Sequence, residues 1–195
     1  IKPGDIKYKD LNGDLVTDGK DYTVIGRALP LHTGGLNNNF RYKAFDLNVF
    51  FQWSYGNDIL NANRLIFEGN GRGIYNLNQY ETYVNRWTPD NPSNTLFRAG
   101  GQGPAFFSSR VIEDGSFLRF KTISAGYNLQ ANSLKHLKIN ALRIYMSVQN
   151  LVTWTSYSGM DPEVSVRSST PLTPGFDYSA YPRARTFTFG LNLTL

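Results

Sequence analysis

The chain has 195 residues, of which 41% are hydrophobic, 14% aromatic and only 18% charged. This composition is too apolar for a disordered chain, and the absence of cysteine excludes a disulfide framework, a cysteine-based zinc site and thiol catalysis. The net charge is +5, but the basic residues are scattered without forming a stripe, so we expect no nucleic-acid partner.

Residues 1–34 are predicted to form a loop. Because the chain begins with Ile1 and no charged-then-apolar leader follows, we expect a mature or cut product. The loop contains an acidic segment with the ligand spacing of an EF-hand: Asp10, Asn12, Asp14, Asp18 and Asp21. Leu15 stands where that motif has glycine, and Asp21 is shorter than the usual glutamate. Two interpretations remain, a Ca²⁺ site that rigidifies the loop and a metal-free loop of Asx turns.

Alternation of apolar and polar residues with period two predicts five β-strands. They are residues 36–42, 45–55, 117–129, 142–152 and 185–195. The last is the clearest, because one face carries Phe187, Phe189, Leu191, Leu193 and Leu195. The alternation changes phase near Lys121, which predicts a β-bulge or a strand whose upper part leaves the apolar layer. Residues Lys43–Ala44 are predicted to form a tight hairpin turn, and 130–140 a short basic connection.

Two long segments rich in turn-forming residues, 57–116 and 154–184, separate the strands. A helix is predicted at 76–86 within the first of them, where apolar residues recur at helical spacing. Aromatic residues in these segments could stack on the flat faces of sugar rings or pack the loops themselves. The candidate ligand-binding residues are Tyr80, Tyr83, Trp87 and Tyr157.

Short and long connections alternate along the chain, which is typical of a transmembrane β-barrel with short periplasmic turns and long outer loops. An eleven-residue strand tilted by about 40° rises roughly 27 Å, which matches an apolar band of about 25 Å. On this interpretation 43–44 and 130–140 are periplasmic, and 1–34, 57–116 and 154–184 are extracellular. The alternative is a soluble antiparallel sheet with one wet face, which explains the alternation equally well.

Six stretches of the chain have recognisable motifs: GDIKYKDLNGDLVTDGKDYTVIG (4–26), FRYKAFDLNVFFQWSYGNDILNA (40–62), NRWTPDNPSNTLFRAG (85–100), FLRFKTISAGYNL (117–129), LRIYMSVQNLVTWTSYSGMDPEV (142–164) and RTFTFGLNLTL (185–195). In the same order, they resemble segments of SusC/RagA-type TonB-dependent outer-membrane transporters. The resemblance covers nearly the whole chain. It implies an all-β fold in which this chain supplies about the last five strands of a 22-strand barrel, as a single C-terminal portion, 1–195.

The resemblance further implies TonB-driven import of oligosaccharides, or less often peptides, across the bacterial outer membrane. The implied partners are a SusD-like surface lipoprotein, TonB and outer-membrane lipid. The sequence has no candidate plug domain or TonB box, so we expect the chain to act as part of a larger assembly. The alternative function is a soluble carbohydrate-binding or adhesin module, and a passive porin is a third class.

Catalytic activity has little support in the sequence, and we expect no enzyme. The chain has only two histidines, His32 and His136, both predicted in loops or turns. Four basic residues are predicted to face the barrel interior: Arg41, Arg119, Lys121 and Arg143. They would either line a polar translocation path or pair with acidic groups of the plug or of neighbouring strands.

Overall fold

The computed structural model describes residues 1–69, 77–101, 106–129, 139–164 and 173–194. The chain divides into two units. One, hereafter the loop unit, combines Ile1–Ala28, Asp58–Glu113 and Val164–Ala180. The other, hereafter the sheet unit, combines Leu29–Asn57, Asp114–Glu163 and Tyr181–Leu195.

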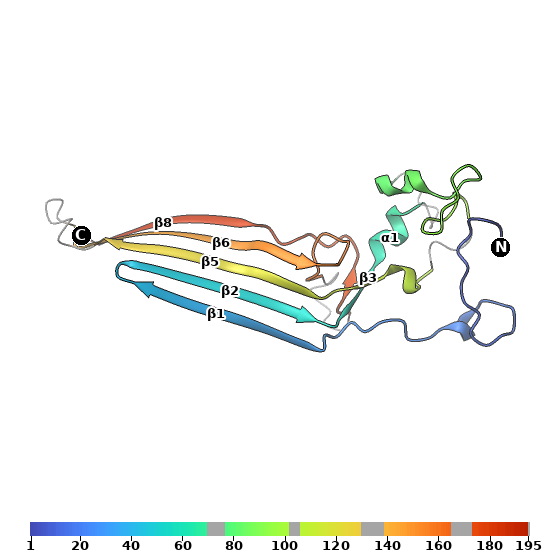
Figure 1. Cartoon of the computed structure of the whole chain (residues 1–195), viewed down its shortest axis with the longest axis horizontal. Helices are drawn as coiled ribbons and strands as arrows, with labels where there is room; N and C mark the ends of the chain where they lie inside the picture. The colour runs from blue at the N-terminus through green and yellow to red at the C-terminus, as the bar shows by residue number, and fades with distance from the viewer. Residues whose placement is uncertain (70–76, 102–105, 130–138, 165–172, 195) are drawn as a thin grey trace. The chain divides into compact units, whose positions relative to one another are not determined.

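The sheet unit is built on a five-stranded antiparallel sheet with the order β1-β2-β5-β6-β8 (Figure 1). Its strands are β1 (His32–Tyr42), β2 (Phe45–Tyr55), β5 (Phe117–Leu129), β6 (Ala141–Thr155) and β8 (Thr186–Thr194). The five predicted strands are therefore confirmed, although β1 begins earlier and β6 ends later than the alternation alone indicated. Leu195 lies outside the described residues.

The predicted hairpin turn at Lys43–Ala44 is also confirmed. Tyr42 pairs with Phe45 across it, and Lys43 adopts a left-handed backbone with φ of 53°. The predicted basic connection after β5, including His136, falls mostly on 130–138 and lies outside the described residues.

The phase change at Lys121 is a β-bulge, as predicted. Phe50 and Phe51 of β2 are adjacent, yet they pair with Thr122 and Phe120, so that Lys121 is the extra residue of β5. The bulge restores one apolar face along the strand, and Phe120 accordingly stacks on Phe51 with ring centroids 4.7 Å apart. A second irregularity lies at the same level, where Asn150 and Leu151 of β6 are opposite Lys121.

The apolar face of this sheet is open rather than packed. Its side chains remain exposed on all five strands, including Leu36 (54%), Phe45 (58%), Leu118 (42%), Ile144 (49%) and Phe189 (74%). The opposite face is polar. There the side-chain amide of Asn48 donates to both Asn37 and Asn39 at 2.7 Å. The sheet is amphipathic, and many residues of its apolar face are on the surface, although Val148 is buried.

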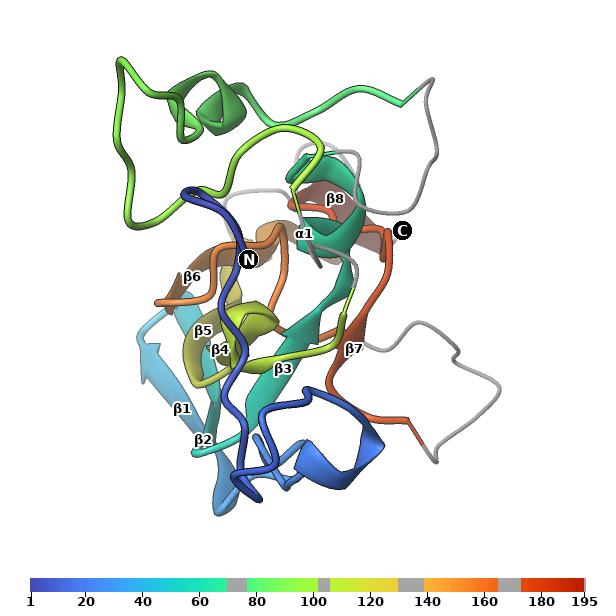
Figure 2. The same cartoon turned by 90° about the vertical axis from the view of Figure 1, so that its right-hand side faces the viewer.

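The loop unit has a small buried core of conventional kind. It contains the three-stranded sheet β4-β3-β7 and helix α1 (Figure 2). The elements are η1 (Gly19–Asp21), β3 (Asp58–Asn61), α1 (Ala62–Phe67), η2 (Glu81–Asn85), η3 (Ser109–Val111), β4 (Ile112–Asp114) and β7 (Phe176–Asp177). Ala62, Leu65 and Val111 are buried together, and Leu60 and Phe176 pack against them.

The helix predicted at 76–86 is wrong over the described residues 77–86. Only Glu81–Asn85 is helical there, as a short 3₁₀ turn. Leu77 and Val84 of the predicted apolar face are 44% and 70% exposed, so no tertiary packing supports a longer helix. The six-residue helix α1 was missed because it is too short to show a helical period. Among the described residues, no helix is long and apolar enough to cross a membrane.

Candidate functional site

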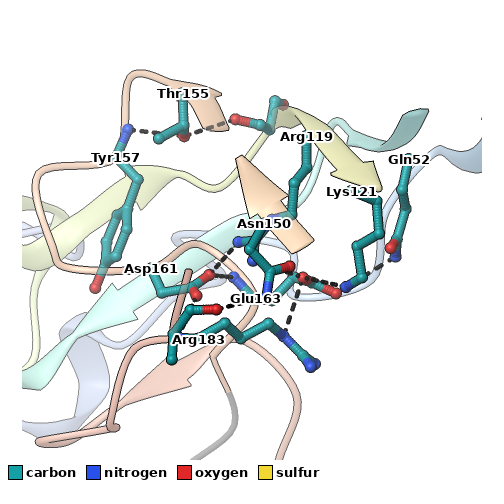
Figure 3. Close-up of polar contacts among 11 residues, drawn as sticks. Gln52, Arg119, Lys121, Asn150, Thr155, Tyr157, Asp161, Glu163 and Arg183 are labelled. Atoms are coloured by element: carbon teal, nitrogen blue, oxygen red, sulfur yellow. Dashed lines mark hydrogen bonds and ion pairs between the residues drawn. The ribbon is translucent and has the colours of Figure 1, made fainter. Parts of the chain in front are cut away.

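The polar face of the sheet carries a group of charged side chains at the strand ends remote from the Lys43–Ala44 turn. We call it the ion cluster. Its members are Gln52, Arg119, Lys121, Asp161, Glu163 and Arg183 (Figure 3). They come from β2, from β5, from the segment after β6 and from the segment before β8. The cluster therefore joins parts of the sheet unit that are far apart in sequence.

Arg119 is the centre of the ion cluster and is only 2% exposed. Its Nη2 lies 2.5 Å from Asp161 Oδ1, and its Nη1 lies 3.2 Å from Glu163 Oε2. The guanidinium also lies over the ring of Phe117, 5.5 Å from the centroid. Burial of a charge is tolerated only when it is paired and hydrogen-bonded, and these contacts supply that pairing.

Glu163 is shared among several donors. Its Oε2 lies 3.4 Å from Lys121 Nζ and 3.1 Å from Arg183 Nε, in addition to its contact with Arg119. Its Oε1 accepts a hydrogen bond from Gln52 Nε2 at 3.4 Å. One carboxylate thereby links β2, β5 and the segment that precedes β8.

Asp161 is held in its charged form. Burial alone would raise the pKa of its carboxyl group, but the hydrogen bond from Arg119 and those from the backbone N–H groups of Arg183 and Glu163 outweigh burial. The net effect lowers the pKa of Asp161 below its ordinary value.

A hollow of about 270 Å³ adjoins the ion cluster within the sheet unit. Its walls include Arg119 and Asp161 together with Asn150, Thr153, Arg183 and Arg185. Two atoms of these walls, Arg119 Nε and Asn150 Oδ1, are buried without a hydrogen-bond partner among the described residues. The hollow thus combines positive charge with unused hydrogen-bonding capacity.

A second ion pair lies on the polar face, where Arg143 donates from both Nη atoms to Asp46 at 2.8 and 2.7 Å. Gly126 leaves room for this pair, because a Cβ there would lie 2.5 Å from Arg143 Nη2. Of the four basic residues predicted to face the interior, Arg119, Lys121 and Arg143 pair with acidic groups of neighbouring segments. For these three, the interpretation as charge pairing is confirmed. Arg41 lies exposed on β1.

The predicted ligand-binding aromatics pack against their own chain. Tyr83 is 8% exposed and lies 6.0 Å from Phe97, ring centroid to ring centroid. Trp87 lies against the backbone of Gly4, where a Cβ would be 2.6 Å from its ring. Tyr80 is 41% exposed, whereas Tyr157 is 5% exposed and belongs to the sheet unit. Burial raises the pKa of both Tyr80 and Tyr83. Ligand binding by these residues stays a prediction.

The acidic segment of the loop unit forms a chain of short-range hydrogen bonds. Asp10 accepts from the backbone N–H groups of Gly13 and Leu15 at 2.6 and 2.7 Å. Asp21 accepts from Leu11 and Asp18 at 2.7 and 2.9 Å, and the bond from Leu11 is the main cause that lowers the pKa of Asp21.

These are bonds that an Asx-turn loop makes. Asn12, Asp14 and Asp18 accept further backbone N–H groups within the same segment. Over the described part of the chain, no group of three or more His, Cys, Asp or Glu side chains is arranged to hold a metal ion. The calcium site stays a prediction.

The side chain of His32 packs against aromatic residues of the neighbouring strand β2. Its ring stacks on Tyr55 with centroids 5.2 Å apart, and its Nδ1 accepts a hydrogen bond from Trp53 Nε1 at 3.2 Å. Sequence reasoning missed Asp161, Glu163 and Arg183 as members of the ion cluster. The sequence does contain an acidic pair, Asp161 and Glu163, close after a predicted strand. Nothing in the sequence shows which basic residues face this pair.

No family model matches the chain. It is 40% identical over 197 residues to TonB-dependent receptor P3 of Formosa agariphila, covering 98% of this chain and 19% of that protein. It is 30% identical over 203 residues to TonB-dependent receptor SusC of Bacteroides thetaiotaomicron, covering 98% of this chain and 18% of that protein.

Among solved structures, the chain is similar to the RagAB peptide importer in the open-open state. The TM-score is 0.71 at 28% identity, covering 86% of this chain and 17% of that one. For the closed-closed state of the same importer the TM-score is 0.72 at 27% identity, covering 87% of this chain and 18% of that one. The chain spans about a fifth of the length of the curated relatives it matches.

Proposed function

Because the chain belongs to the SusC/RagA-like TonB-dependent receptors of the bacterial outer membrane, we propose that it forms part of the wall of a barrel that imports nutrients. The observation that carries this proposal is the open apolar face of the five-stranded sheet, on which residues such as Phe187 and Leu191 are 58% and 61% exposed. Lipid is the solvent in which such a face is stable.

The same face argues against the alternative, a soluble carbohydrate-binding or adhesin module. Contiguous apolar patches of this extent are rare on soluble monomers and lead to aggregation. The relatives are named as receptors, which agrees with the expectation that the chain is not an enzyme.

The remaining architecture is inferred from the family. The edge strands β1 and β8 would pair with further strands of a 22-strand barrel, since an open sheet edge is not stable in lipid. This chain would supply five strands near the C-terminal end of that barrel. The long segments 1–34, 57–116 and 154–184 would be extracellular, and 43–44 and 130–140 periplasmic. The plug and the segment that contacts TonB would lie elsewhere in the protein.

For the cargo, we propose an oligosaccharide delivered through a SusD-like surface lipoprotein. The similarity to SusC supports this choice. A peptide is the second candidate, because solved structures that the chain resembles in fold belong to a peptide importer. The acidic segment with Asp10 and Asp21 would bind Ca²⁺ and rigidify an outer loop.

The first test is the denatured mass of the polypeptide in its native membrane, detected with an antibody against this segment. We expect a mass several times 22.0 kDa, with the protein released only by detergent. The second test is uptake of labelled oligosaccharides and of labelled peptides by cells with and without the full-length gene. Uptake should require the gene and should stop when the proton-motive force is dissipated. Uptake that survives dissipation would indicate a passive porin.

A further inference from the structure

The ion cluster and the adjoining hollow contain more positive than negative charge. Four basic side chains meet there: Arg119, Lys121, Arg183 and Arg185. Among the described residues, two carboxylates oppose them, Asp161 and Glu163. Such an excess of positive charge attracts an anion to the hollow.

The oxygens of both carboxylates are already occupied. Asp161 Oδ1 accepts from Arg119 Nη2 and from the backbone N–H of Glu163, and its Oδ2 accepts from the backbone N–H of Arg183 at 2.9 Å. Glu163 Oε2 contacts three cations, and its Oε1 accepts from Gln52. Little acceptor capacity is left for further donors.

As a result, some hydrogen-bond donors of these arginines have no acceptor. Arg119 Nε is buried without a hydrogen-bond partner among the described residues. The side chain of Arg185, which also lines the hollow, makes no ion pair with any described residue. Arginine presents several N–H donors in a planar fork that matches the two oxygens of a carboxylate.

The hollow has the size of a subsite rather than of a whole binding pocket. Its volume of about 270 Å³ lies just below the usual range of ligand pockets, about 300–1,000 Å³. Its wall is otherwise largely polar, with Thr153 and Thr155 beside the arginines, which suits a hydroxyl or N–H group beside the anion.

We propose that this hollow binds a carboxylate group of the imported substrate, with Arg185 as its donor and the buried charge of Arg119 beside it. The inference rests on the proposed import function and narrows its substrate class to anionic molecules. Two sources supply the required chemistry, a uronic acid unit of an oligosaccharide and the terminal carboxylate of a peptide. Both carry a hydroxyl or N–H donor next to the carboxylate.

The test uses the full-length receptor in detergent and two matched pairs of probes. One pair is tetragalacturonate and its methyl ester, and the other is tetra-alanine and its C-terminal amide. Calorimetry should show that the charged member of one pair binds about tenfold more tightly than its neutral counterpart, the gain expected of one charge-assisted contact. The pair that shows this preference identifies the source of the carboxylate.

The variant Arg185→Gln should abolish the preference, and Arg185→Lys should restore part of it. Arg185 is exposed, so neither change should impair folding. The matched control is Arg41→Gln, which removes an exposed cation at the turn end of the same sheet and should keep the preference.

Equal binding of the charged and neutral probes, or no binding of any probe, would overturn the carboxylate site. The uptake test would stand independently, because import of a neutral cargo needs no such site. A preference that persists in Arg185→Gln would overturn the placement in this hollow. Loss of thermal stability in Arg185→Gln with an unchanged preference would instead indicate an intramolecular partner, such as the plug, and would also overturn it.

Discussion

The loop unit and the sheet unit distribute apolar and charged residues in opposite ways. In the loop unit, Leu65 and Val111 are 2% and 0% exposed and form a small core. In the sheet unit, Leu191 and Phe189 are 61% and 74% exposed, while the charged Arg119 is 2% exposed. The first arrangement suits water outside the protein, and the second suits lipid on one face of the sheet and a polar interior on the other.

The difference shows that burial by itself does not identify what stabilises a fold. The loop unit gains stability by removing apolar surface from water. In lipid the apolar face of the sheet gains little in this way, so its specificity depends on backbone pairing and on ion pairs such as Arg119–Asp161 and Arg143–Asp46. Substitutions in the two units should therefore have different effects.

The largest effect is expected for Arg119→Ala. It leaves Asp161 and Glu163 without their buried partner, which should lower the free energy of unfolding by about 3–5 kcal/mol. The measurement is denaturant unfolding of the full-length receptor in lipid vesicles. Arg41→Ala serves as the control and should cost less than about 0.5 kcal/mol, as exposed changes do. Equal costs would mean that the ion cluster does not stabilise the sheet.

Leu65→Ala tests the opposite arrangement in the loop unit. It should cost about 2–5 kcal/mol through lost burial and the cavity left behind. Hydrogen exchange of the amides around α1 and Val111 reports this loss locally, while the exchange of β5 should stay unchanged. Leu77→Ala, at a position 44% exposed in the same unit, is the control. Comparable exchange in both variants would contradict a packed core.

Leu191→Arg tests whether the apolar face contacts lipid. Near the bilayer midplane this change should cost about 2–4 kcal/mol, because the charge must leave water. Asn192→Arg, on the polar face of the same strand, should cost much less. An unchanged free energy of unfolding for Leu191→Arg in vesicles would place this face in water and would revive the soluble alternative.

Gly190→Ala tests packing on the polar face. A Cβ at Gly190 would lie 2.1 Å from Cζ of Tyr145, whose ring covers this glycine from the neighbouring strand. We expect a cost of about 1–3 kcal/mol from overpacking. In a Tyr145→Ala background the same change should be nearly neutral, and a double-mutant cycle measures the difference.

The smallest effect is expected for the dependence of stability on pH. Because the pKa of Asp161 is lowered in the folded state, its contribution to stability is present above the ordinary aspartate pKa and is lost as pH falls through the folded value. The stabilities of the wild type and of Asp161→Asn should therefore converge below about pH 4. A gap that stays constant on acidification would show that the charge of Asp161 does not matter.

The strands could be predicted because one face of the sheet is apolar and the other makes polar contacts, which imposes a strict alternation. Even the exception, Phe50 on the polar side, has a local cause, since its ring lies over Gly35, where a Cβ would be 2.9 Å away. The bulge at Lys121 was likewise visible as a change of phase.

The ion cluster could not be predicted as a unit. Arg119 and Asp161 are 42 residues apart in sequence, and their contact depends on the path of the segment after β6, which follows no periodic pattern. Helix α1 was missed for a related reason. Its six residues are stabilised by tertiary packing around Leu65 rather than by a recognisable amphipathic repeat.

The register irregularities of β5 and β6 lie next to each other, beside Phe50 of β2. Between the paired positions on either side, β2 has no extra residue, β5 has one (Lys121) and β6 has two (Asn150 and Leu151). Each strand is thus one residue longer than the one before it, and since bulges bend strands and increase their twist, the sheet is creased along this line. Lys121 of the ion cluster lies on this line, and Gln52 and Arg119 lie between it and the strand ends remote from the Lys43–Ala44 turn. Substitutions on the ion-cluster side of this line should therefore alter the cluster while the hydrogen-bond register on the other side stays fixed.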